Sequence, residues 1–239
     1  MERVFSQPRS LSFSDCDRDN ELKLSTYLAW TSEIAGYQMD YRGVPRSLMM
    51  EEGQVFLLSK SSVRMLKPAR YLQNCTLRTW EYKLQGVQFI RHYSLEDENG
   101  DPIRQSVSSW FLADPVSRKI IRPSEYSHDI LLHEEPVAAE LKRLKLSDFP
   151  KTAEHTVLLT ELDNNQHMNN RFYGDLLVNY APKELFGKPL VSADIAYVHE
   201  AYLGETIAIH TAQISKDTYA MYGELPNGKR CFDGQAQVK

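Results

Sequence analysis

The chain has 239 residues, of which 42% are hydrophobic and 25% are charged, a balance typical of soluble globular proteins. Its formal net charge is −4, whereas most nucleic-acid-binding proteins are strongly basic. The charge therefore argues against a general nucleic-acid-binding protein. Its three cysteines lie far apart and form no C-x-x-C pair, which excludes a zinc knuckle and a disulfide framework.

The start of the chain, from Met1 to Pro8, holds no apolar run of the kind found in signal peptides. No stretch of the sequence is apolar for long enough to cross a bilayer. Few and scattered cysteines suit a reducing compartment. We therefore expect a cytoplasmic protein that binds neither membrane nor nucleic acid and that uses no metal and no cofactor.

The first predicted elements are a helix and a hairpin. Helical spacing relates a set of residues near the start, namely Leu24, Tyr27, Leu28, Thr31, Ile34 and Ala35. Residues 87–95 alternate with a period of two, which predicts a half-buried strand. This strand ends near Asn99-Gly100, where a positive φ angle costs little, and residues 103–112 form the predicted return strand.

Residues 128–150 differ in character from the segments on either side and are interpreted as a linker. Within them, residues 136–146 favour a surface helix that carries the chain across the molecule. The basic run formed by Lys142, Arg143 and Lys145 is interpreted as a solvated face of that helix.

The same order of elements recurs in the second half. Helical spacing relates Phe172, Tyr173, Leu176, Leu177 and Tyr180. Residues 219–225 and 230–238 flank Asn227-Gly228 and predict a second hairpin.

An offset of 146 residues relates Asp17 to Asp163 in these two halves, and the offset falls to 131 between Leu72 and Leu203. Loop-length differences between two copies of one plan would produce such a drift. A sheet with one apolar face must cover that face, and wrapping the sheet around a helix does so. We therefore predict an α+β tandem (double) hotdog, each half an antiparallel sheet wrapped around a long central helix. The expected domains are 1–127 and 151–239, joined by the linker 128–150.

The most informative segment, Thr160-Glu-Leu-Asp163-Asn-Asn165-Gln-His167-Met-Asn169-Asn170, precedes the second predicted helix. A polar loop with an asparagine N-cap would explain one or two of its side chains but not the D-x-N-x-H spacing. In an extended segment, residues at i, i+2 and i+4 lie on the same side. Asp163, Asn165 and His167 are therefore expected to converge ahead of a helix N-terminus that offers free backbone N–H groups.

This segment closely resembles the active-site segment of acyl-acyl carrier protein thioesterases, which in plants reads D-x-N-Q-H-x-N-N. The likeness covers essentially the whole chain and includes the downstream Ala196-Tyr-Val-His-Glu200. It implies that the family's catalytic residues fall on Asp163, Asn165, His167 and Glu200. It also implies an enzyme of fatty acid biosynthesis that hydrolyses fatty-acyl thioesters on acyl carrier protein. The absence of an organelle-type leader favours the bacterial type of this family.

One position departs from the family pattern, because Glu200 is followed by Ala201 where the family commonly has a cysteine. A thiol nucleophile is therefore excluded there, and the reaction is expected to run through water or through a carboxylate that forms an anhydride. The offsets pair Asn165 with Asp19, His167 with Glu21 and Glu200 with Ala69. We therefore predict that the C-terminal half is catalytic and that the N-terminal half is degenerate and shapes the substrate pocket.

Each predicted residue has an expected role. Glu200 would act as the general base for water, while His167 polarises that water or protonates the leaving sulfur. Asn165 would position the water or the thioester carbonyl, and Asp163 would anchor the loop by accepting backbone N–H bonds.

Two further groups are candidates for holding the substrate. Backbone N–H groups near Asn169 and Asn170 are expected to stabilise the oxyanion. Trp30 and Tyr37, in the first predicted helix, are candidates for lining an acyl tunnel.

Two alternatives stay open from the sequence, an acyl-coenzyme A thioesterase of the same fold and a non-catalytic acyl-binding hotdog protein. Turnover of an acyl thioester would exclude a protein that only binds acyl chains. A comparison of the rates on carrier-bound and coenzyme-A-bound chains would then separate the two kinds of thioesterase. The acyl chain length and the oligomeric state, monomer or homodimer, are also left open.

Overall fold

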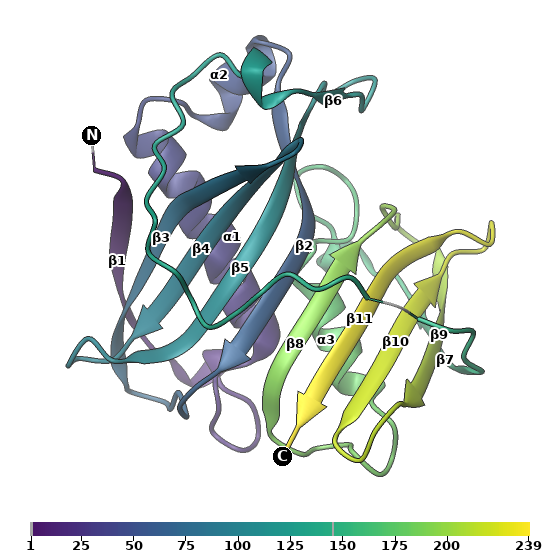
Figure 1. The fold of residues 1–239 in the computed structure, drawn as a ribbon. Coiled ribbons are helices and arrows are strands. Elements are labelled where there is room, and N and C mark those ends of the chain that lie inside the picture. The colour runs from purple at the N-terminus through teal and green to yellow at the C-terminus, as the bar shows by residue number, and fades with distance from the viewer. Residues whose placement is uncertain (1, 145) are drawn as a thin grey trace. The chain divides into compact units, whose positions relative to one another are not determined.

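The computed structural model describes residues 2–144 and 146–239, which form two compact units (Figure 1). Unit 1 comprises Met1–Lys23 and Ala29–Leu141, and unit 2 comprises Leu24–Leu28 and Lys142–Lys239. The segment predicted as a linker is therefore divided between the two units.

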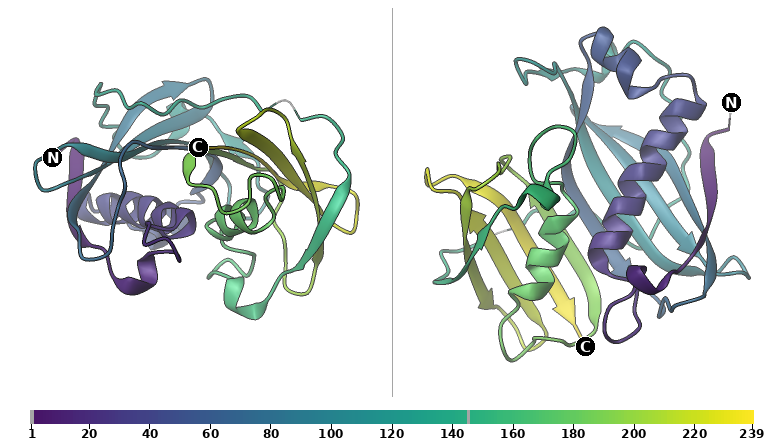
Figure 2. Two further views of the ribbon diagram at one scale, coloured as in Figure 1. Left: turned by 90° about the horizontal axis from the view of Figure 1, so that it is seen from below. Right: turned by 180° about the vertical axis from the view of Figure 1, so that it is seen from behind.

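Unit 1 is built on an antiparallel sheet in the order β1-β3-β4-β5-β2, with a short strand, β6, added to β5. Its strands are β1 (Val4–Ser10), β2 (Val55–Met65), β3 (Asn74–Gln85), β4 (Gln88–Glu96), β5 (Pro102–Ala113) and β6 (Ile120–Ile121). The sheet curves around helix α1 (Leu24–Tyr41), as Figure 2 shows from below and from behind. A second helix, α2 (Arg46–Glu51), and the 3-10 turns η1 (Phe13–Asp15) and η2 (Pro123–Glu125) complete the unit.

Helix α1 confirms the helix predicted from the spacing of its apolar residues. All six residues of that pattern are buried, Tyr27 and Ile34 completely. The helix ends at Tyr41, shortly before Gly43, whose φ of 75° suits a glycine after a helix C-terminus.

Both predicted hairpins are confirmed. Strands β4 and β5 pair around a turn in which Gly100 has a φ of 83°. In unit 2, β10 (Thr218–Glu224) and β11 (Arg230–Val238) pair around Gly228, whose φ is 78°. A glycine reaches these positive φ angles without steric cost, which explains why Asn-Gly is a strong signal for a hairpin.

The helix predicted over 136–146 is wrong for the residues that the structure describes there, which have no helical structure; Lys145 lies outside them. Residues 128–141, which we call the strap, instead run extended across the face of the unit 1 sheet opposite to α1 (Figure 1). Val137, Ala139 and Leu141 pack with Ile90 and Val107 of the sheet. Their spacing of two places all three on one side of an extended chain.

Hydrogen bonds to unit 1 strands hold the strap in place. The N–H of His133 donates to the Glu81 carbonyl over 2.8 Å, and the N–H of Ala138 donates to Oε1 of Gln105 over 2.8 Å. The indole N–H of Trp80 donates to the Glu135 carbonyl over 3.0 Å. These bonds satisfy backbone groups that a helix would otherwise satisfy internally.

Strand β4 is buried on both faces, so its prediction as a half-buried strand is wrong. Phe89 packs with Met39 of α1 on one face, whereas Ile90 packs with Ala139 of the strap on the other. The strap also covers His92, whose Nδ1 contacts the Glu135 carbonyl at 3.1 Å, and burial lowers the pKa of His92 to about 4. Two covered faces, rather than one, explain why polar residues of the alternating pattern are buried.

Unit 2 repeats this plan with a sheet in the order β8-β11-β10-β9-β7, whose neighbouring strands are antiparallel. Its other strands are β7 (Lys151–Thr156), β8 (Leu190–Tyr197) and β9 (Thr206–Gln213). This sheet curves around helix α3 (Phe172–Asn179), which follows the 3-10 turn η3 (Leu159–Glu161) (Figure 2).

Helix α3 has the buried face that the sequence predicts, with Tyr173, Leu176 and Leu177 all buried. It has only 8 residues, against 18 in α1, so the long central helix expected in each half of the sequence is found in the first half alone. Pro182 explains the early end, because a proline disfavours helical backbone at the residue before it. The hydroxyl of Tyr219 in β10 donates to the carbonyl of Leu177 over 2.8 Å, which ties the sheet to the helix.

Candidate active site

The polar segment before α3 forms a tight turn between Asp163 and Met168. The N–H of Asp163 donates to the His167 carbonyl over 3.1 Å, and the N–H of Gln166 donates to the Asp163 carbonyl over 2.9 Å. Gln166 has a φ of 64°, in the left-handed region that turns use. The expectation of an extended segment with three side chains on one side is therefore wrong.

Asp163 holds this turn together. Its Oδ1 accepts the N–H of Asn165 over 2.8 Å, the pattern of an aspartate that hydrogen-bonds the backbone two residues ahead. This is the anchoring contact that the sequence predicts for Asp163. Asn165 lies at the exposed tip of the turn.

Backbone pairing places His167 next to the segment that carries Glu200. His167 and Tyr202 form an antiparallel bridge, and the N–H of Met168 donates to the Ala201 carbonyl over 2.8 Å. His167 and Glu200 thus lie on neighbouring segments that are held together by main-chain pairing. Main-chain pairing, and not only side-chain contacts, therefore brings His167 and Glu200 together from two distant parts of the sequence.

The imidazole of His167 and the carboxylate of Glu200 face each other. Nε2 of His167 lies 3.5 Å from Oε1 of Glu200. The His167 side chain is 12% exposed and that of Glu200 33% exposed, so the pair is partly shielded but open to a ligand. Nδ1 of His167 lies 3.3 Å from the Met168 carbonyl, which can only accept, so a hydrogen bond there requires the proton to be on Nδ1.

Ala201 lies in the interior with no exposed surface, whereas Glu200 is part-exposed. Successive residues of an extended segment point to opposite sides, so the side chain at position 201 points away from His167. A cysteine there would not face the imidazole. Burial also raises the pKa of the Cys231 thiol to about 12, which keeps this thiol protonated and poorly nucleophilic.

The two asparagines before α3 differ in what their backbone N–H groups do. The N–H of Asn169 donates to the Glu161 carbonyl over 2.9 Å, so it is not available to bind an oxyanion. Oδ1 of Asn169 accepts the N–H of Arg171 over 3.0 Å, which satisfies one donor at the start of the helix. The N–H of Asn170 has no hydrogen-bond partner within the part of the chain that the structure describes. Of the two predicted oxyanion donors, Asn170 remains available.

Tyr202 was not identified from the sequence. Its hydroxyl donates to Oε2 of Glu200 over 2.8 Å. The only signal in the sequence is its position two residues after Glu200, which places both side chains on one side of an extended segment.

Unit 1 contains a turn with the same hydrogen bonds as the 163–168 turn. The N–H of Asp17 donates to the Glu21 carbonyl, and the N–H of Leu22 donates to the Ala69 carbonyl. These bonds confirm that Glu21 takes the place of His167. They pair Ala69 with Ala201, so Glu200 corresponds to Pro68, and the predicted pairing of Glu200 with Ala69 is wrong by one residue.

The carboxylate of Glu21 is held by structural contacts in unit 1. Its Oε2 accepts the N–H of Ala69 over 3.0 Å, and its Oε1 lies 3.9 Å from Nη2 of Arg70. This turn has no imidazole, and Pro68 occupies the position that corresponds to Glu200 in unit 2. It therefore lacks the acid–base pair found in unit 2.

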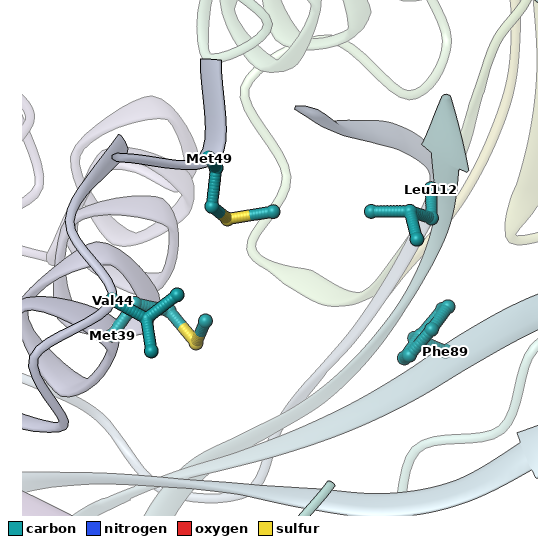
Figure 3. Packing of buried hydrophobic residues seen from close by; sticks show 5 residues of the cluster. All are labelled: Met39, Val44, Met49, Phe89 and Leu112. Atoms are coloured by element: carbon teal, nitrogen blue, oxygen red, sulfur yellow. The ribbon is translucent and has the colours of Figure 1, made fainter. Parts of the chain in front are cut away.

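Unit 1 holds a mainly apolar cavity of about 270 Å³ between α1, α2 and the sheet. Figure 3 shows Met39, Val44 and Met49 facing Phe89 and Leu112, all residues of the cluster beside this cavity. The lining residues are Ser32, Ala35, Gly36, Met39, Asp40, Val44, Arg46, Met49, Gln54, Val55, Phe56, Glu81, Phe89, Ile90, Arg91 and Trp110.

The two tunnel residues predicted from α1 do not border this cavity. The Trp30 side chain is buried, and the guanidinium carbon of Arg9 lies 5.3 Å from the centre of its ring. The Tyr37 side chain is 43% exposed. Ala35 and Met39, on the same helix, lie on the face that does border the cavity.

No group of three or more histidine, cysteine, aspartate or glutamate side chains among the described residues is arranged to hold a metal ion. None of the helices described in the structure has the length and apolar character needed to cross a membrane.

Two family models match the chain. One, described as the acyl-ACP thioesterase N-terminal domain, matches residues 2–130, and another, described as the acyl-ACP thioesterase C-terminal domain, matches residues 145–231. No curated protein matches the chain by sequence.

Solved structures with low sequence identity share the fold. An acyl-ACP thioesterase from Bacteroides thetaiotaomicron is 17% identical, has a TM-score of 0.91 and is matched over 99% of this chain and 98% of that chain. The 12:0-ACP thioesterase from Umbellularia californica is 14% identical, with a TM-score of 0.82 over 100% of this chain and 98% of that chain. The predicted tandem hotdog fold is thus confirmed.

Proposed function

This chain belongs to the acyl-ACP thioesterase family and is a thioester hydrolase, and we propose that His167 and Glu200 of unit 2 carry out the hydrolysis. The enzyme hydrolyses fatty-acyl thioesters of acyl carrier protein and releases free fatty acid. The observation that carries the proposed site is the distance of 3.5 Å between Nε2 of His167 and Oε1 of Glu200. An imidazole and a carboxylate at this separation can share one water molecule and its proton.

In the proposed reaction, the Glu200 carboxylate removes a proton from a water molecule whose oxygen attacks the thioester carbonyl carbon. The carbonyl oxygen becomes an oxyanion. When this oxygen re-forms the carbonyl double bond, the carbon–sulfur bond breaks and the sulfur leaves with the bonding electron pair. The proton passes from Glu200 to Nε2 of His167 and then to the sulfur. The products are the fatty acid and the free thiol of the carrier protein.

The surrounding residues support this reaction in different ways. A proton on Nδ1 of His167, directed at the Met168 carbonyl, leaves Nε2 to accept and pass on the transferred proton. The N–H of Asn170, at the start of α3, is the proposed donor to the oxyanion, and such a donor is typically worth about 3 kcal/mol of barrier. Asn165 positions the water or the carbonyl from the tip of the turn, and Asp163 keeps the turn closed.

We assign the acyl chain to the cavity of unit 1. Its mainly apolar lining suits a hydrocarbon chain, since each buried methylene contributes about 0.8 kcal/mol. The loss of the acid–base pair from the unit 1 turn fits a unit that binds and does not catalyse. This assignment gives the division of labour expected from the sequence, with residues 1–127 as the pocket half and 151–239 as the catalytic half.

Ala35→Phe, which places a ring in this cavity, is expected to lower kcat/KM for long acyl chains far more than for short ones. Exclusion of two methylenes corresponds to about 15-fold in kcat/KM. The measurement is thiol release from acyl carrier protein loaded with a series of chain lengths. Ala138→Phe, at an exposed strap position away from the cavity, serves as the control. An equal loss at every chain length in Ala35→Phe would place the acyl chain elsewhere.

The proposed partner is acyl carrier protein, and the proposed compartment is the cytoplasm. Cys16, Cys75 and Cys231 are all free and buried, which suits a reducing environment.

A further inference from the structure

We propose that Tyr202 is a positioning residue that fixes the orientation of the Glu200 carboxylate during hydrolysis, an inference that rests on the proposed function. The phenol hydroxyl donates to Oε2 of Glu200 over 2.8 Å, while Oε1 of the same carboxylate faces Nε2 of His167 at 3.5 Å. A carboxylate held at one oxygen cannot rotate freely about its last bond. The hydrogen bond therefore directs Oε1 toward the imidazole.

The backbone N–H and carbonyl of Tyr202 both form hydrogen bonds with Glu205. Its N–H donates to Oε2 of Glu205 over 2.8 Å, and its carbonyl accepts the N–H of Glu205 over 3.0 Å. The bridge between Tyr202 and His167 adds a third fixed point. Gly204, with a φ of 78°, lets the chain turn directly after this point. The phenol thus extends from a rigid turn rather than from a mobile loop.

The corresponding position of unit 1 supports this role. Arg70 makes the same backbone contacts there that Tyr202 makes in unit 2, because its N–H donates to Oε1 of Gln73 and its carbonyl accepts the N–H of Gln73. Its guanidinium lies 3.9 Å from Glu21, the counterpart of His167. In unit 1 this side chain lies near Glu21, a residue of the turn, and in unit 2 it contacts Glu200, on the segment beside the turn. In unit 2 that carboxylate is the one assigned to catalysis.

The exposure of Tyr202 indicates a role in orientation rather than in stability. Its side chain is 48% exposed, so removal of the hydroxyl leaves no buried polar group without a partner. Glu200 is 33% exposed, and water can replace the lost hydrogen bond to the carboxylate. Water restores the solvation of the carboxylate but not its orientation. The expected loss is therefore in kcat and not in folding.

Tyr202→Phe removes only the hydroxyl and is expected to lower kcat about tenfold, the low end for a hydrogen bond to a charged group. KM for acyl carrier protein loaded with a fatty acid is expected to stay within about twofold, because the phenol does not bind the acyl chain. The melting temperature is expected to change by no more than about 2 °C. A lower melting temperature with an unchanged kcat per folded molecule would assign Tyr202 a structural role and overturn the proposal.

The same substitution in a Glu200→Gln background tests whether Tyr202 acts through Glu200. If it does, the tenfold penalty of Tyr202→Phe disappears once Glu200 is replaced, because the residues form one unit. A penalty that persists in full would show that Tyr202 acts by another route. If Glu200→Gln alone leaves kcat unchanged, the assignment of Glu200 fails. If Glu200→Gln is slow but Tyr202→Phe is not, only the positioning role fails.

Discussion

Glu200→Gln is expected to lower kcat at least about 100-fold, the usual scale for a general base, while the protein stays folded. The amide keeps the size of the side chain and still accepts the Tyr202 hydroxyl, so the local structure is retained. An amide does not accept a proton from water at neutral pH, so the attacking water is no longer activated. The measurement is thiol release from acyl carrier protein under saturating substrate.

Glu184→Gln provides the matched control. Glu184 is an exposed glutamate of unit 2 that lies between α3 and β8, outside the proposed site. The same chemical change there is expected to leave kcat within about twofold of the unsubstituted enzyme. If a folded Glu200→Gln enzyme turned over as fast as this control, Glu200 would not be the base.

His167→Ala is expected to give the second large effect, again a loss in kcat of at least about 100-fold. Without the imidazole, no group in the proposed scheme passes the proton from Glu200 to the departing sulfur. The backbone bond between Met168 and Ala201 does not depend on the side chain, so the turn and its neighbouring segment keep their pairing. Thiol release and a melting curve, measured on the same preparation, separate lost chemistry from lost folding.

Glu21→Gln is the corresponding change in unit 1. The glutamine at this position, which is equivalent to that of His167, can still accept the Ala69 N–H. Because this turn has no role in the proposed chemistry, kcat per folded molecule is expected to stay within about twofold. A loss of kcat in Glu21→Gln as large as in His167→Ala would mean that both turns take part in the reaction.

The sequence predicts the local elements of the fold well, because each depends on residues close together in the chain. Asn99-Gly100 and Asn227-Gly228 mark both hairpins through the φ angles that glycine allows. The apolar spacing of α1 and α3 likewise identifies both helices and their buried faces.

The errors concern segments whose structure is decided by distant partners. Residues 136–146 have the composition of a surface helix, yet the alternation of Val137, Ala139 and Leu141 fits an extended strap that covers a sheet. The strap also explains why His92 is buried on a strand predicted to be half-exposed. Only the tertiary structure shows that this strand has a cover on each face.

The site was predicted in part. Spacing alone led to an extended segment, whereas the segment is a turn closed by Asp163 and Gln166. The meeting of His167 with Glu200 depends on a bridge between residues more than thirty positions apart, and the family resemblance rather than the local pattern pointed to it. Tyr202 was missed because its role arises only once Glu200 has been placed.

The most direct test of the catalytic assignment is a crystal structure of the enzyme with an acyl-pantetheine amide, a substrate analogue that resists hydrolysis. The assignment predicts an amide carbonyl beside the Glu200 and His167 side chains, with a water molecule about 3 Å from the Glu200 carboxylate. It also predicts that the carbonyl oxygen accepts the N–H of Asn170. A carbonyl bound at the Glu21 turn of unit 1, or out of hydrogen-bond reach of both His167 and Glu200, would contradict it.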